Sequence, residues 1–273
     1  MSRRLIAIAI LLAVLGGLAP GASARAQQTG PAVAVTGVDE SAYPLVRAFV
    51  SVTDADGAPV AGLERDAFSV MVDATELKPD VAPASESPLA LVLVVEASDS
   101  MRGGRLELVT QAASGLIRAL GPDDRIALLA FGSETNVVVP LTADRARVVN
   151  GLTALQAGGG SALHEAVQAA VYVAVSSGAP RSAIVLLADG PGDPSPGVSA
   201  EAATSVAAGS GIPVYAIGLG DDAAPYLALL ATATAGQFRP ANAGNIGLAF
   251  EETAAAVQGQ YALDFEVDAP ADG

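Results

Sequence analysis

Residues 89–100, LALVLVVEASDS, join the most apolar run of the chain to a group of oxygen-bearing side chains. The apolar run, residues 89–95, is typical of a strand buried on both faces in the centre of a parallel sheet. Open α/β sheets bind their ligands at the carboxyl ends of such strands. Glu96, Ser98 and Ser100 follow at alternate positions, with Asp99 between the serines. Because carboxylate and hydroxyl oxygens are hard donors, this loop predicts a site for Mg²⁺, Mn²⁺ or Ca²⁺ rather than for zinc or copper.

Strand and helix patterns alternate from Leu89 to residue 258, which predicts βαβ units. The fold class is therefore α/β, with a doubly wound, mainly parallel sheet and helices on both of its faces. The expected strands are 89–95, 125–131, 183–187 and 213–217, with an antiparallel edge strand at 136–141. The expected helices are 105–120, 143–155, 161–176, 198–208, 223–233 and 245–257.

A small β module is expected before this domain, at residues 34–82, and resembles half of an immunoglobulin-like sandwich. Its strands are predicted at 46–52 and 68–72, because residues there alternate or are rich in β-formers. Residues 83–88 are expected to link the module to an α/β domain at 89–258. The remaining residues, 259–273, hold an alternating strand that needs a partner. It either pairs with the N-terminal β segment or begins a β module of a longer chain.

The N-terminus has the pattern of an export signal. Arg3 and Arg4 precede an apolar stretch, Leu5–Leu18, and Ala24-Arg25-Ala26 fits a small-x-small cleavage site. Residues 1–26 are thus expected to be removed, and residues 27–33 to form a flexible tail; an uncleaved anchor is the alternative. The apolar stretch is short for a bilayer span, and no later stretch is long and apolar enough. We expect a mature chain outside the cytoplasm: periplasmic, secreted or associated with the cell surface.

Composition excludes one class of partner and limits the covalent chemistry. The chain is 51% hydrophobic, which provides for a large core, and its net charge is −15 with a pI near 4.3. Such an acidic chain has little to replace the counterions of a phosphate backbone, so we expect no nucleic-acid binding. Cysteine is absent, which excludes disulfides. Acidic doublets such as Asp123-Asp124 are expected to be solvated charges at loops and helix ends.

Two further loops carry oxygen donors that could converge with the first. Ser161 follows three glycines, 158–160, and Asp189 follows the strand expected at 183–187. Each has an ordinary alternative, since serine often caps a helix and Asp-Gly often forms a turn. The order and spacing of the three loops favour one shared site.

These loops resemble the metal-ion-dependent adhesion site of the von Willebrand factor type A domain, and residues 89–257 resemble the domain itself. The family's first motif, Asp-x-Ser-x-Ser, corresponds to Glu96-Ala-Ser98-Asp99-Ser100. A threonine after glycines corresponds to Ser161, and an aspartate that closes a strand corresponds to Asp189. Residues 214–222, VYAIGLGDD, resemble the family's late strand and loop. The β module resembles one that precedes this domain in some exported bacterial members.

The resemblance implies a function and a role for each site residue. Ser98 and Ser100 would bind the cation directly, Ser161 directly or through water, and Glu96 and Asp189 would mainly hold coordinated waters. The open position would accept an aspartate or glutamate of a protein partner. Glu96 stands where the family has aspartate, and its extra methylene could bring it into the first shell, displace a water or spoil the site. Asp99 could compensate only if it pointed inward.

Enzymatic function is not expected. His164 is the only histidine of the chain, and a partly exposed position in the first turn of a helix is predicted for it. A nucleophilic triad has no other base to use. Gly218-Leu-Gly220 lacks the third glycine of a dinucleotide fingerprint, and Gly158–Gly160 lacks the Lys-Ser/Thr of a P-loop. The alternatives to adhesion are a scaffold that has lost the metal and, less favoured, an extracytoplasmic hydrolase.

Overall fold

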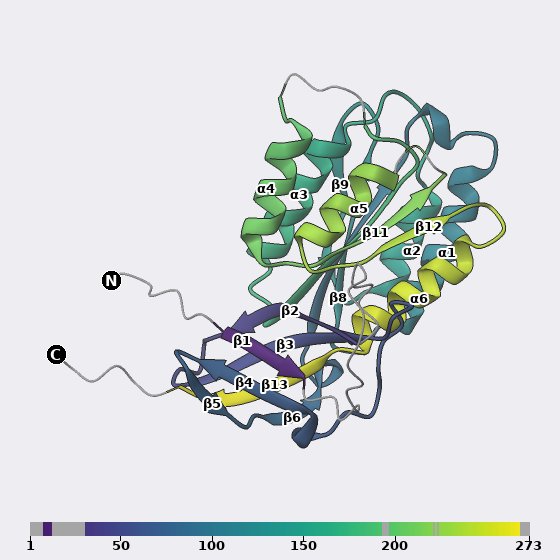
Figure 1. Ribbon diagram of the computed structural model, residues 1–273. Helices are drawn as coiled ribbons and strands as arrows, with labels where there is room; N and C mark the ends of the chain where they lie inside the picture. The colour runs from purple at the N-terminus through teal and green to yellow at the C-terminus, as the bar shows by residue number, and fades with distance from the viewer. Residues whose placement is uncertain (1–7, 13–30, 193–196, 221, 223, 268–273) are drawn as a thin grey trace, which may run out of the picture. The chain divides into compact units, whose positions relative to one another are not determined.

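The computed structural model describes residues 8–12, 31–192, 197–220, 222 and 224–267 (Figure 1). The chain divides into two compact units. One is an α/β unit, Ser87–Gln258, and the other is a β unit made of the residues up to Glu86 and those from Gly259 onward. The α/β unit is thus inserted into the sequence of the β unit.

The α/β unit contains a six-stranded sheet in the order β12-β11-β10-β7-β8-β9. All neighbouring pairs are parallel except β8 and β9, which pair antiparallel at one edge. This confirms the predicted fold class. The strands are β7 (Leu89–Glu96), β8 (Arg125–Phe131), β9 (Thr135–Thr142), β10 (Arg181–Ala188), β11 (Val214–Leu219) and β12 (Phe238–Ala241).

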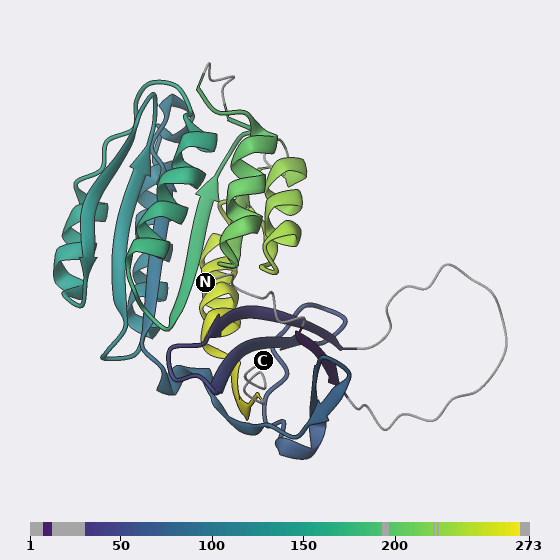
Figure 2. The same cartoon turned by 90° about the vertical axis from the view of Figure 1, so that its left-hand side faces the viewer.

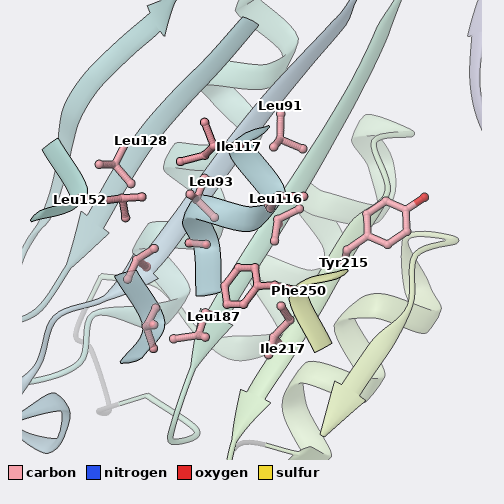
Figure 3. Close-up of a cluster of buried hydrophobic side chains, with 14 of the residues drawn as sticks. Leu91, Leu93, Leu116, Ile117, Leu128, Leu152, Leu187, Tyr215, Ile217 and Phe250 are labelled. Atoms are coloured by element: carbon pink, nitrogen blue, oxygen red, sulfur yellow. The ribbon is translucent and has the colours of Figure 1, made fainter. Parts of the chain in front are cut away.

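Helices cover both faces of this sheet (Figure 2). One layer consists of α1 (Arg105–Ala119), α2 (Arg145–Thr153) and α6 (Ile246–Gln258), and the other of α3 (Leu163–Ser176), α4 (Ala200–Ser210) and α5 (Ala224–Ala233). Every residue of β7 is buried because its side chains alternate between the two layers. Leu91 and Leu93 pack with the α1 layer (Figure 3), and Val92 and Val94 pack with the α3 layer.

Some local expectations differ from the structure. β12 was not anticipated, because it has only four residues and contains Pro240, which is tolerated in an edge strand but gives no strand pattern. Asp124 is not a solvated charge: it is 3% exposed and accepts a hydrogen bond from the backbone N–H of Leu89, at 2.9 Å. The doublet with Asp123 suggested a solvated charge, because nothing in the local sequence indicates that the fold brings residues 89 and 124 together.

The β unit consists of two sheets that share one apolar core. The four-stranded sheet has the order β2-β3-β13-β6, and the three-stranded sheet has the order β1-β4-β5. Valines of β3, Phe68 and Val70 of β4, and Leu263 of β13 belong to this core. The strands are β1 (Ile8–Leu12), β2 (Ala32–Asp39), β3 (Leu45–Thr53), β4 (Phe68–Val72), β5 (Thr75–Leu77), β6 (Asp80–Pro83) and β13 (Tyr261–Glu266). Short 3₁₀ turns lie at η1 (Arg65–Ala67) and η2 (Ala84–Glu86) in this unit, and at η3 (Asp99–Met101) in the α/β unit.

The first and last strands of the β unit bear on two expectations about the ends of the chain. β13 pairs antiparallel with both β3 and β6, so the late strand pairs with the N-terminal β segment. Residues 32 and 33 belong to β2 and not to a flexible tail, which corrects the expectation for residues 27–33. The predicted cleavage site, residues 24–26, lies outside the described residues. Within the described ranges, no helix has the length and apolar character needed to cross a bilayer.

Candidate metal centre

The predicted donor residues meet at the carboxyl ends of two neighbouring strands. Glu96 is the last residue of β7, and Asp189 directly follows β10, which pairs parallel with β7. Ser98 directly precedes η3, Ser100 lies within it, and Ser161 lies just before α3. Together they line a cleft of about 470 Å³. The structure therefore brings all five predicted residues to one place.

Four of these residues form a ring of close polar contacts, in which three contacts are hydrogen bonds to or from a carboxylate or amide and the fourth brings two serine hydroxyls together. The Ser98 hydroxyl donates to Glu96 Oε1 at 2.8 Å, and the hydroxyl oxygens of Ser98 and Ser100 are 2.7 Å apart. Ser100 donates to Asp189 Oδ1 at 2.8 Å. The backbone N–H of Asp189 then donates to Glu96 Oε2, also at 2.8 Å. Both carboxylate oxygens of Glu96 are thus engaged, so the extra methylene is accommodated within the ring.

Glu96 lies in an environment that disfavours its charge. It is 1% exposed, and burial raises the pKa of its carboxyl group. The negative charge of Asp189 raises this pKa further, whereas hydrogen bonds from the Asp189 amide and from the hydroxyls of Ser98 and Ser161 lower it. Two carboxylates close together in a buried site are stabilised by a cation between or beside them.

The donor set fits a small hard cation. A Mg²⁺ ion with oxygens at about 2.0–2.1 Å in octahedral geometry separates adjacent oxygens by about 2.9 Å. The hydroxyl and carboxylate oxygens of the ring are 2.7–2.8 Å apart, the usual spacing of O–H···O hydrogen bonds, so the fit rests on the type and convergence of the donors. Among the described residues, no group of three or more His, Cys, Asp or Glu side chains could hold a metal. The candidate site instead combines two carboxylates with serine hydroxyls.

The glycine loop is held in place by the loops that follow β7 and β8. Gly158 N–H donates to the carbonyl of Ala97 at 2.8 Å, and Gly160 N–H donates to the Ser133 hydroxyl, also at 2.8 Å. Gly159 has φ of +80°, and a side chain there would collide with Ser133. This loop sets the position of Ser161.

Asp99 belongs to the support of this loop and not to the ring. Its Oδ1 accepts a hydrogen bond from the backbone N–H of Gly159 at 3.1 Å and forms an ion pair with Arg102 at 2.7 Å. Its backbone N–H donates to the Gly159 carbonyl. Asp99 therefore does not replace Glu96.

Sequence reasoning missed Arg105, the first residue of α1. Its Nη1 lies 3.0 Å from Asp189 Oδ2 and 3.2 Å from the carbonyl oxygen of Ser100, and its Nη2 donates to the carbonyl of Leu219. The side chain is 42% exposed and lines the cleft. A cation in the first turn opposes the helix dipole, which favours acids there. This unfavourable position of Arg105 is the one signal in the sequence that could have indicated an acidic partner outside the helix.

At the start of α3, the alternative for Ser161 and the expectation for His164 do not hold. The helix begins at Leu163 with Ala162 as its N-cap, so Ser161 is not the capping residue, and its hydroxyl interacts with Glu96 instead. His164 is 8% exposed rather than partly exposed. Its ring packs edge to face against Tyr226, with centroids 4.9 Å apart, and it is not among the residues that line the cleft.

Comparisons with known proteins identify the α/β unit. Residues 90–249, more than half of the chain, match the sequence model of the von Willebrand factor type A domain. An uncharacterized protein of Synechocystis sp. is 34% identical over 137 residues, which are 49% of this chain and 33% of that protein. The chain thus spans about a third of the length of this curated relative.

Solved structures share the fold at low sequence identity. The von Willebrand factor domain of a type V pilus tip protein from Porphyromonas gingivalis superposes with a TM-score of 0.53 at 17% identity, covering 62% of this chain and 94% of that one. Proximal thread matrix protein 1 from the mussel byssus, solved with zinc in its metal-ion-dependent adhesion motif, gives a TM-score of 0.58 at 16% identity. That match covers 69% of this chain and 49% of the mussel chain.

Proposed function

Because this chain belongs to the von Willebrand factor type A domain family, we propose that it is an extracytoplasmic protein-binding or adhesion module. It captures a carboxylate of a protein partner through a divalent cation at the carboxyl edge of the sheet. The single observation that carries this proposal is the ring of Glu96, Ser98, Ser100 and Asp189. It gathers two carboxylates and two hydroxyls in a cleft open to solvent.

Each residue of the proposed site has a distinct task. Ser98 and Ser100 hold the cation through their neutral hydroxyls, with Ser161 as a third hydroxyl donor. Neutral donors leave the cation electron-poor, so that it attracts an aspartate or glutamate of the partner. Glu96 accepts hydrogen bonds from the backbone amide of Asp189 and the hydroxyl of Ser98, and so holds the first and third loops in fixed positions relative to each other. Asp189 orients the Ser100 hydroxyl.

The cation is Mg²⁺ in this proposal, with Mn²⁺ and Ca²⁺ as alternatives. All three prefer oxygen ligands, and Mg²⁺ demands the near-octahedral spacing described above. The mussel protein carries zinc in the corresponding motif, which supports a divalent cation without specifying which one. The partner is a protein that presents an exposed carboxylate, and the family relationship to a pilus tip domain supports an adhesive role outside the cytoplasm.

Arg105 favours a second candidate function, a scaffold that works without metal. Its guanidinium forms an ion pair with Asp189 at 3.0 Å and so compensates part of the negative charge of the site. Both oxygens of Glu96 already have hydrogen-bond partners within the ring. In the scaffold, these contacts hold the three loops together for assembly rather than for capture of a carboxylate.

Thermal unfolding with and without the cation separates the two functions. The chain is scanned in 10 mM MgCl₂ and in EDTA, and again with MnCl₂. A ligand at ten times its dissociation constant stabilises the folded state by about 1.4 kcal/mol. We expect a cation-dependent rise in the midpoint of the α/β unit.

Glu96→Asp is the matched control, because it restores the family's shorter acid. A shift in Glu96→Asp together with no shift in the unaltered chain would favour the scaffold. No shift in either protein would remove the metal-dependent function altogether. Binding of an immobilised Asp-containing peptide, measured with and without EDTA, then tests capture of the carboxylate directly.

A further inference from the structure

One edge of β4 is covered by a segment that lies inside the proposed export signal. In the three-stranded sheet, β4 lies between β5 and β1. β5 pairs with three residues of β4, whereas β1 pairs antiparallel with all five, from Ile8 opposite Val72 to Leu12 opposite Phe68. Removal of residues 1–26 would take away β1 and leave this edge of β4 without a neighbour.

An empty edge at this position would border the core of the β unit. Phe68 and Val70 are fully buried and Val72 is 5% exposed, and all three belong to the apolar core shared by the two sheets. An uncovered edge presents a row of unpaired backbone N–H and C=O groups. Here that row would lie next to apolar side chains, which is the arrangement that binds another strand by β-augmentation.

We propose that, in the exported protein, this edge of β4 is a docking site for an extended apolar strand of a partner protein. The inference is independent of the cation site and rests on removal of the export signal. The backbone of the partner strand forms the ladder that β1 forms in the structure, and alternate side chains of that strand complete the core.

The register of β1 specifies the chemistry of the partner strand. Ile8, Ile10 and Leu12 lie opposite Val72, Val70 and Phe68. Directly opposed residues of an antiparallel pair share one face of the sheet, and for β4 this is the face that packs into the core. The docking strand therefore carries aliphatic residues at its first, third and fifth positions and runs antiparallel to β4.

The second and fourth positions of the docking strand are less restricted. They lie opposite Met71 and Ser69, which are not part of the shared core. The Ser69 hydroxyl donates to Glu76 of β5 at 2.7 Å, so this face of the small sheet carries polar groups beside Met71. A lysine in the partner strand is tolerated at these positions, whereas an aspartate at the third position is not.

The test uses the exported protein and a synthetic peptide that carries the sequence IAILL between pairs of lysines. Mass spectrometry first defines the N-terminus of the exported protein. Binding is measured by fluorescence anisotropy, and hydrogen exchange is followed in residues 68–72. We expect the peptide to bind and to slow exchange at least tenfold at the β4 amides that face β1 rather than β5. Chain purified with residues 1–26 still attached should bind at least tenfold more weakly, because β1 occupies the edge.

Two peptide variants provide matched controls that leave the fold of the protein untouched. Aspartate at the third position should weaken binding at least tenfold, and lysine at the fourth position should change it less than threefold. Equal affinity for both variants would overturn the proposal. So would retention of residues 8–12 in the exported protein, or failure of the peptide to bind. Slow exchange, before any peptide is added, of the β4 amides that face β1 rather than β5 would also overturn it.

Discussion

Buried carboxylates lie at both ends of the α/β sheet, and the two differ in what surrounds them. At the carboxyl end Glu96 is 1% exposed, and at the amino end Asp124 is 3% exposed. Each joins segments that are distant in sequence. Asp124 accepts hydrogen bonds from the N–H groups of Leu89 and Gly121, at 2.9 and 2.8 Å, and from the side chain of Gln258 at 3.2 Å. It thereby connects the first strand of the α/β unit to its last helix.

The charges around the two groups point to different functions. Asp124 interacts with the buried guanidinium of Arg181, whose pKa is lowered by burial and raised by the charge of Asp124. Glu96 lies beside a second carboxylate, Asp189, and among serine hydroxyls, and the nearby Arg105 is 42% exposed. Burial of a carboxylate is therefore no sign of a binding site by itself. Excess negative charge together with neutral hydroxyl donors is the distinguishing feature of the carboxyl end.

The largest expected loss of stability follows substitution of Asp124, at the amino end of the sheet. Asp124→Ala leaves the N–H groups of Leu89 and Gly121 without their acceptor and removes the negative charge near the buried Arg181. It should destabilise the α/β unit by about 3–5 kcal/mol. Urea denaturation followed by circular dichroism measures the change. Asp124→Asn, which keeps an acceptor oxygen, should cost less than half as much. The response to Mg²⁺ should persist in Asp124→Asn, and an unchanged unfolding midpoint in Asp124→Ala would contradict the structural role.

Ser98→Ala should combine a moderate loss of stability with loss of the cation response. It removes the hydroxyl that donates to Glu96 Oε1, and an unsatisfied buried acceptor costs about 1–3 kcal/mol. It also removes a proposed direct ligand of the cation. Paired thermal scans in MgCl₂ and EDTA measure both effects. A cation-dependent shift as large as that of the unaltered protein would exclude Ser98 as a ligand.

Glu96→Gln should not lower the stability of the metal-free protein, in contrast to the substitutions of Asp124. The amide keeps an acceptor for the Asp189 N–H and a partner for Ser98, and it removes one of two neighbouring charges. Without metal, the free energy of unfolding should stay the same or rise by about 1 kcal/mol, because burial of the charge is relieved. The cation-dependent shift should disappear. Destabilisation like that of Asp124→Ala would mean that the two carboxylates have the same structural role.

Arg105→Gln should give the smallest effect and separate the two candidate functions. Arg105 forms an ion pair with Asp189 and adds positive charge beside the proposed cation. Its removal should strengthen Mg²⁺ binding about threefold, a modest change because the guanidinium is partly exposed and screened by solvent. Titration calorimetry with MgCl₂ measures the affinity. An unstable protein with no cation response would instead support the metal-independent scaffold, and Arg105→Lys would test the need for charge alone.

Much of the fold and the candidate site could be predicted because both depend on local patterns. An uninterrupted apolar strand, 89–95, implies a sheet covered on both faces, and the loops after such strands meet at one edge. Arg105 was missed because its partner, Asp189, is 84 positions away in the sequence. Ser161 could locally be a helix cap or a metal ligand, and only the start of α3 at Leu163 removed the capping alternative.

The sequence by itself determined the α/β architecture, the order of the three donor loops and the family resemblance that the family match later supported. These follow from hydrophobic periodicity and from short motifs, whose information is carried by neighbouring residues. Tertiary structure decided which carboxylate is compensated by a buried arginine and which lies among hydroxyls. It did so because hydrogen bonds such as that from the Asp189 amide to Glu96 join residues 93 positions apart, and their geometry exists only after β7 and β10 have paired.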